Sequence, residues 1–159
     1  MQKIAVSRIS KASARLAMAC GLLFANSPVW AEDEAKCTNK MLKGEYAFHI
    51  EGVILALPGA TIPPGGIPIR GVAMSTFDGK GKMTQVDHIV AGGTPPPIPW
   101  TPGTATYTVN PDCTGNWVLT VPGSPFSPVL VSFVVSKKGD EIRTVVESNA
   151  VTSIGTKVD

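Results

Sequence analysis

The side chains of this sequence that could do chemistry are few and far apart. Glu51, Arg70, His88 and Glu147 each fall near the end of an expected strand. If two or three of them faced the inside of an apolar fold, their pKa values would shift toward the range that acid–base chemistry uses. Arg70 stands among apolar neighbours, so it could clamp the carboxylate of a ligand. The plainer interpretation pairs Arg70 with a glutamate at the surface.

Other kinds of catalytic site are not indicated. The sequence has no His-Glu-x-x-His pair, no glycine-rich phosphate loop and no Gly-x-Ser-x-Gly elbow. A metal site would need His49 and His88 together with carboxylates such as Glu51 or Asp87, and the two histidines lack ligand spacing. We therefore expect no metal and no cofactor. The catalytic candidates are Arg70, Glu51 and His88.

Two kinds of connection alternate along the chain. Tight polar turns at 78–81, 110–113 and 137–140 are interleaved with long proline-rich segments at 56–68, 92–103 and 121–128. In an up-and-down antiparallel sheet every second connection lies at the same end. The three long loops are therefore expected to share one end, the mouth, and the tight turns to close the other.

The long loops carry apolar side chains that would meet at this mouth. They could plug a barrel, frame a pocket for an apolar ligand, or form a surface for self-association or for a partner. Proline stiffens such loops and lowers the entropy lost when they are ordered. The pocket interpretation assigns ligand binding to Ile62, Ile67, Arg70, Ile98, Trp100 and Phe126.

The elements that must hold these residues are strands. Apolar runs are short, rich in Val, Ile, Thr and aromatic residues, and broken by Gly and Pro. Alternation places Tyr46, Phe48 and Ile50 on one face, which turns Glu51 to the other. The expected strands are Gly44–Leu55, Ile69–Phe77, Lys82–Ala91, Thr104–Val109, Gly115–Val121, Val129–Ser136, Glu141–Ser148 and Val151–Val158.

Eight such strands predict an all-β fold, an eight-stranded antiparallel up-and-down barrel. The spacing has no long crossover, which favours a closed barrel over a Greek-key sandwich, and closure removes both sheet edges. The sixth strand is apolar on both faces, with Leu130 and Val134 opposite the inward valines. We expect something to cover its outer face.

Residues 1–31 have the pattern of a cleavable signal peptide. Four basic residues precede the apolar run 16–25, and Val29-Trp30-Ala31 suits cleavage after Ala31. The run is shorter than the roughly 20 residues of a membrane-spanning helix, and Cys20 lies too near Arg15 for lipoprotein processing. We expect residues 32–159 to form the barrel domain, located in the periplasm or secreted, with no integral membrane segment after processing.

Cleavage changes the charge and the cysteine count. Removing four of the 14 basic residues leaves 10 against 12 acidic ones, a net charge of −2. Nucleic-acid binding, which needs a basic surface, is not expected. Two cysteines remain, Cys37 before the first strand and Cys113 in the second tight turn. In an oxidising compartment such a pair predicts a disulfide at the closed end.

Three segments of the sequence form a recognisable combination. They are Cys37 with 42–48 and Gly52, then 75–81, then 103–115, of which Tyr-Thr-Val-Asn-Pro-Asp-Cys-Thr-Gly is the most specific part. Together they resemble exported bacterial allene-oxide-cyclase-like (calycin-like) barrel proteins. The resemblance implies an eight-stranded antiparallel barrel with an apolar interior. Its matched residues are turn formers and core aromatics, so it assigns no catalytic residue.

The sequence therefore leads to three functional hypotheses. The first is a binding protein that takes a small, largely apolar molecule through the proline-rich mouth. The second is a cofactor-independent cyclase or isomerase in which Arg70, Glu51 or His88 would move protons. The third is a structural or assembly role for the apolar rim.

Overall fold

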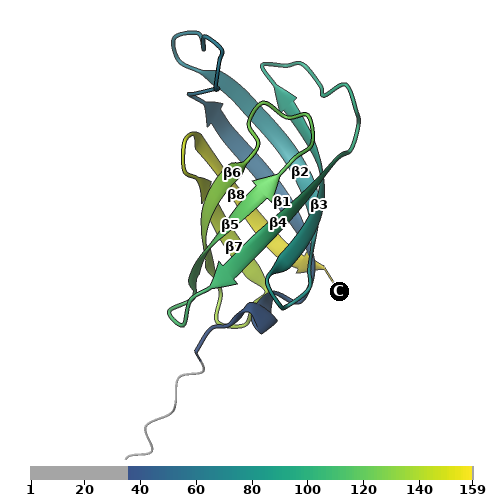
Figure 1. The fold of residues 1–159 in the computed structure, drawn as a ribbon, viewed down its shortest axis with the longest axis vertical. Coiled ribbons are helices and arrows are strands. Elements are labelled where there is room, and N and C mark those ends of the chain that lie inside the picture. The colour runs from purple at the N-terminus through teal and green to yellow at the C-terminus, as the bar shows by residue number, and fades with distance from the viewer. Residues whose placement is uncertain (1–35, 159) are drawn as a thin grey trace, which may run out of the picture. The chain divides into compact units, whose positions relative to one another are not determined.

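Alternating inward and outward side chains build a closed barrel of eight antiparallel strands (Figure 1). The computed structural model describes residues 36–158. Every predicted strand is confirmed, with ends shifted by no more than three residues. The predicted signal peptide lies outside the described residues. A 3-10 turn, η1 (Asn39–Leu42), precedes β1 (Gly44–Ile54), β2 (Ile67–Phe77), β3 (Lys82–Ala91), β4 (Thr101–Val109), β5 (Thr114–Thr120), β6 (Val129–Val135), β7 (Glu141–Val146) and β8 (Ala150–Val158).

The first strand closes the barrel. It pairs with β2 on one side and with β8 on the other, and each remaining strand pairs with its neighbours in sequence. The connections therefore alternate between the two ends. The three long loops share the mouth and the tight turns share the closed end, as the alternation of loop types predicts (Figure 1).

Burial follows a period of two along each strand. On β1, Tyr46 and Phe48 are buried whereas Glu45 and His49 are exposed. The four valine and phenylalanine positions of β6 also face inward as predicted. Leu130 and Val134, on the outer face of β6, are each 50 % exposed. The cover expected over this face is thus not found among the described residues.

Aromatic rings fill the bore toward the closed end, and we call them the aromatic floor. Phe77 lies 5.2 Å between ring centroids from both Tyr46 and Tyr107, and Trp117 lies 5.0 Å from Phe133. These edge-on and tilted contacts are the favoured geometries for aromatic pairs. The floor consists of Tyr46, Phe48, Phe77, Tyr107, Trp117 and Phe133.

Glycines make room for the floor, and the one on β8 is an example. Gly155 faces inward on β8, and a Cβ placed there would lie 2.4 Å from ring atoms of Phe48. Any side chain at this position would collide with the ring. The bore is therefore filled here by a side chain from the neighbouring strand β1.

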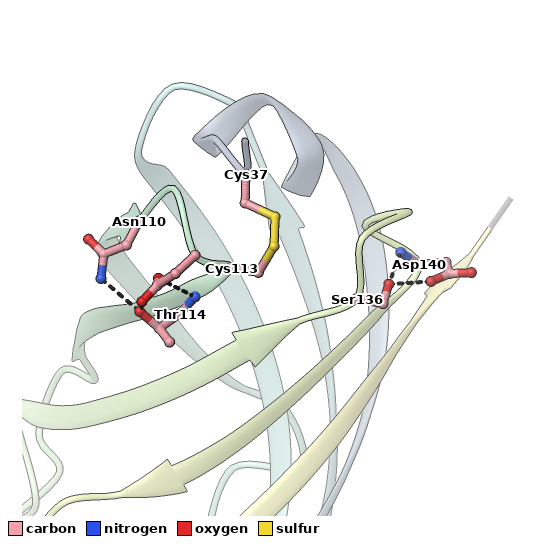
Figure 2. Close-up of a disulfide and its surroundings, with 7 residues drawn as sticks. Cys37, Asn110, Cys113, Thr114, Ser136 and Asp140 are labelled. Carbon is pink, nitrogen blue, oxygen red and sulfur yellow. Dashed lines mark hydrogen bonds between the residues drawn. A yellow bond between two sulfur atoms is a disulfide. The ribbon is translucent and has the colours of Figure 1, made fainter. Parts of the chain in front are cut away.

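The closed end is fastened by a disulfide and by the 3-10 turn. Cys37 and Cys113 are bonded, which confirms the predicted pair (Figure 2). The side chain of Leu42 in η1 is fully buried below the floor. Asn39 accepts hydrogen bonds from the β4 backbone N–H of Val109 at 2.7 Å and, through its carbonyl, from the Tyr107 hydroxyl at 3.3 Å.

Polar side chains shape the tight turns at this end. Asp78 accepts hydrogen bonds from three successive backbone N–H groups, those of residues 80–82, at 2.7–2.9 Å. Figure 2 shows side-chain hydrogen bonds in the other two turns. Asn110 Nδ2 donates to Thr114 Oγ1, and Ser136 Oγ accepts a hydrogen bond from the backbone N–H of Asp140 at 3.1 Å. Side-chain hydrogen bonds of this kind take the place of ladder bonds where the chain reverses.

Removing the disulfide is expected to destabilise the barrel strongly. The bond closes a loop between residues separated by 76 positions, so the chain-entropy relation gives a contribution of about 4 kcal/mol. The double substitution Cys37→Ser and Cys113→Ser should lower the free energy of unfolding in urea by an amount of that order. A matched comparison is the unaltered protein in reductant. An unchanged urea midpoint in both would contradict a structural role for the bond.

Candidate functional site

The mouth carries a second apolar cluster, distinct from the core around the aromatic floor. Ile54, Ile69 and Val151 are buried at its centre. Ile62 and Ile67, from the β1–β2 connection and the start of β2, pack against them, as does Phe126 from the β5–β6 loop. We call these residues the mouth cluster, together with Ile50, Ile89, Ala91 and Val146, which also contact it.

Two predicted members do not join the mouth cluster. Ile98 and Trp100 are 57 % and 54 % exposed. The Trp100 ring instead lies 6.0 Å from the His88 ring, centroid to centroid, and a ring nitrogen of His88 lies 2.6 Å from the carbonyl oxygen of Pro99. His88 alternates outward on β3, so these contacts hold the β3–β4 loop against the outer wall.

The ionisable residues singled out in the sequence also face outward. Arg70 and Glu51 are directly paired across β1 and β2, and their side chains form an exposed ion pair at 3.4 Å. His49 lies 3.9 Å from the same glutamate. Arg70 therefore does not face the inside of the barrel, where it could have bound the carboxylate of a ligand. The surface ion pair, the plainer of the two interpretations, is what the structure contains.

Asp87, which the sequence suggested only as a possible metal ligand, lies inside the barrel. Inward positions on β3 run Met83, Gln85, Asp87 and Ile89. Asp87 is 9 % exposed. Among residues 36–158 it is the one charged side chain that is buried. The two-residue alternation that starts from the buried Met83 predicts the inward position of Asp87.

Asp87 ends a short chain of hydrogen bonds across β2 and β3. The Ser75 hydroxyl donates to Gln85 Oε1 at 3.2 Å, and Gln85 Nε2 donates to Asp87 Oδ2 at 2.9 Å. Ser75 and Gln85 are directly opposite each other in the ladder, which places them in contact. Ser75 is fully buried, so the chain is anchored at its inner end.

Burial raises the pKa of the Asp87 carboxyl above its ordinary value. The hydrogen bond from Gln85 and the nearby His88 act in the opposite direction but are smaller effects. Taking a carboxylate out of water penalises its charged form, and a single neutral donor compensates only in part. The interior therefore holds a carboxyl group whose ionised form has too few hydrogen bonds to offset the cost of its burial.

A second polar pair lies on β7 and β8. The hydroxyls of Thr144 and Ser153 are 2.6 Å apart and satisfy each other. Ser153 is opposite Ile50 in the β1–β8 ladder. The lumen thus has polar groups on two walls, with apolar side chains between them and the mouth.

Several inward-facing side chains of the upper barrel are only half-buried, although the centre of the mouth cluster is buried. The floor residues, such as Phe48 and Trp117, are buried. In contrast, Ile50, Ile89 and Ala91 are half-buried although the alternation of their strands turns them inward. The same holds for Gln85, Val129, Val146 and Ser153. Solvent therefore reaches inward-facing positions of the upper barrel but not the floor.

A shallow hollow also lies on the outer wall. Four of its eight lining residues are threonines of β3, β4 and β5. No group of three or more His, Cys, Asp or Glu side chains in the described part of the chain is placed to hold a metal ion. No helix within residues 36–158 has the length and apolar character needed to cross a membrane.

No protein-family model matches this chain. No curated protein sequence matches it significantly.

Asp87→Asn is expected to change how stability depends on pH. Because the folded pKa of Asp87 lies above the ordinary 3.8, the folded state binds this proton more tightly than the unfolded chain. The carboxyl's contribution to stability therefore falls as pH rises from the ordinary pKa through the raised one. Urea unfolding across this window should show Asp87→Asn gaining stability relative to the unaltered protein as pH increases.

Asp112→Asn is the control with the opposite sign. Hydrogen bonds from Thr114 hold the pKa of the exposed Asp112 below its ordinary value, so its stabilisation is present at neutral pH and is lost in acid. This variant should be less stable than the unaltered protein at neutral pH and approach it as pH falls. Parallel pH trends for the two substitutions would contradict the burial effect at Asp87.

Proposed function

We propose that this chain is an exported barrel protein that binds a small, largely apolar molecule at its proline-rich mouth. The supporting observation is the half-buried state of inward-facing apolar side chains there, notably Ile50, Ile89 and Ala91. Apolar surface that faces inward yet still touches water gains free energy when a ligand covers it, about 25 cal/mol per Å². The aromatic floor would limit how deep such a ligand goes.

The loop geometry supports the same proposal. Ile62 and Phe126 come from two different loops and meet the mouth cluster from above. Proline-rich loops lose little entropy when they order, so they can hold a rim in place without belonging to the sheet. A rim of this kind would enclose a ligand between the loops and the upper barrel wall.

A cofactor-independent cyclase or isomerase is the second candidate. Asp87 is the observation that favours it, because a buried carboxyl with a raised pKa suits proton transfer. Arg70, Glu51 and His88, the groups named for that role in the sequence, are directed away from the bore. A single interior carboxyl fits ligand binding more closely than acid–base chemistry that needs two partners.

We also propose export and membership of the allene-oxide-cyclase-like barrels. The disulfide supports an oxidising compartment, and the eight-stranded up-and-down topology supports the resemblance. Expression of the full chain with intact-mass measurement of the exported fraction tests the first part. We expect a chain beginning at Glu32 and carrying one disulfide. A full-length mass with reduced cysteines would contradict export.

Filling the mouth should abolish binding of an apolar probe. Ala91→Phe adds a ring at an inward position of β3 within the mouth cluster. An uncharged fluorescent dye, N-phenyl-1-naphthylamine, is expected to bind the unaltered protein with increased emission. Its affinity for the variant should fall about tenfold or more, since each tenfold step corresponds to about 1.4 kcal/mol of lost contact.

Val90→Phe is the matched control, because Val90 is the next residue of the same strand and faces the outer wall opposite Arg70. Its dye affinity should stay within about twofold of the unaltered protein, a change worth less than about 0.5 kcal/mol. Thermal unfolding of both variants confirms that they fold. Equal losses in the two variants, or no dye binding by the unaltered protein, would refute binding at the mouth.

A further inference from the structure

The hydrogen-bond chain inside the barrel has a direction. Ser75 donates to the Gln85 carbonyl oxygen, which leaves the Gln85 amide N–H to donate to Asp87. Asp87 is thus the acceptor at the open end of the chain. A ligand group that meets it must complement an acceptor.

One oxygen of Asp87 is left for such a group. Within residues 36–158, Gln85 is the one hydrogen-bond partner of this carboxyl, through Oδ2. No fully buried side-chain nitrogen or oxygen in the same part of the chain lacks a partner. Oδ1 must therefore still be in contact with solvent. Because the side chain faces inward on β3, that contact comes from the lumen.

Asp87 lies directly below the mouth cluster. The next inward residues of β3 toward the mouth are Ile89 and Ala91, both in contact with that cluster. Successive inward positions on a strand are about 7 Å apart. A ligand inserted past Ile89 by one such step would bring its leading group to the carboxylate. The residues opposite Asp87 in the ladder are Ala73 and Thr101, both short side chains.

No side chain in the described part of the chain forms an ion pair with this carboxylate, and the effect of the nearby His88 is smaller than that of burial. Arg70 is engaged with Glu51 on the outer wall, and His88 points away from the lumen toward Pro99. A buried carboxylate with one neutral donor is costly to keep ionised. A cationic group on a ligand would supply both the missing charge and the missing donor.

We propose that Asp87 is the polar anchor of the mouth site and that the ligand is an apolar molecule ending in a hydrogen-bond donor, with an amine preferred. This inference rests on the proposed binding function and adds the chemical class of the ligand. The charge of an amine ligand is opposite to that of the carboxylate ligand that an inward Arg70 would have selected.

Three ligands with the same eight-carbon tail test the anchor. Octylamine, octanol and octanoate compete with N-phenyl-1-naphthylamine for the unaltered protein near neutral pH. We expect octylamine to bind about tenfold more tightly than octanol, as one charge-assisted hydrogen bond allows, and octanoate to bind most weakly. Equal affinities, or a preference for octanoate, would overturn the anchor.

The Asp87→Asn variant separates anchoring from folding. It should lose about tenfold in octylamine affinity while octanol changes less than about threefold, so that the preference between head groups disappears. A purely structural role would weaken all three ligands together. Glu51→Gln is the matched control, because it removes a carboxylate from the outer wall of β1, and it should leave the preference unchanged. Retention of the preference in Asp87→Asn would overturn the proposal.

The outcomes distinguish this inference from the proposed function. Dye binding without a head-group preference would retain the apolar site and discard the anchor. If the dye does not bind, the proposed function fails, and the anchor is tested by the thermal stabilisation that octylamine gives each protein. An equal shift for the unaltered protein and Asp87→Asn, zero included, would then discard the anchor as well.

Discussion

Pairing between β1 and β8 is the constraint on which the rest of this molecule depends. It joins the two ends of the sheet, so neither strand is left as an open edge and each side chain is assigned to the lumen or to the outer wall. Once closure fixes that assignment, the aromatic floor, the mouth cluster and the interior carboxyl have defined positions. A sheet left open between these strands would expose Tyr46 and Phe48 along an edge.

Closure also explains why the two ends of the barrel differ. Tight turns need polar side chains that cap free N–H groups, as Asp78 does, and these turns meet the disulfide and η1 at one end. The long loops carry apolar side chains and are held in two ways. Ile62 and Phe126 pack within the mouth cluster, whereas His88 holds the β3–β4 loop against the outer wall.

The architecture was predictable from the sequence because it depends on local signals. Alternation along β1 and the turn residues around Gly79 each act within a few residues. Cys37 precedes the first strand and Cys113 lies in a tight turn, so each cysteine is assigned to the closed end by its local position. Together these signals predict the barrel and its closed end. The site was less predictable. Loop side chains such as Trp100 can pack on either side of the wall, and no periodicity decides between them. Alternation along β3 predicts that Asp87 faces inward, but its carboxyl group was interpreted as a possible metal ligand and not as part of the interior.

The aromatic floor determines whether a molecule could pass through the barrel. Trp117, Phe77 and their neighbours fill the bore at the closed end, so no passage leads through the barrel. A molecule bound at the mouth, as proposed, would have to enter and leave by the same opening, next to the Ile62 and Phe126 loops. Any transfer to another molecule would have to happen rim to rim, with the receiving surface presented to these loops.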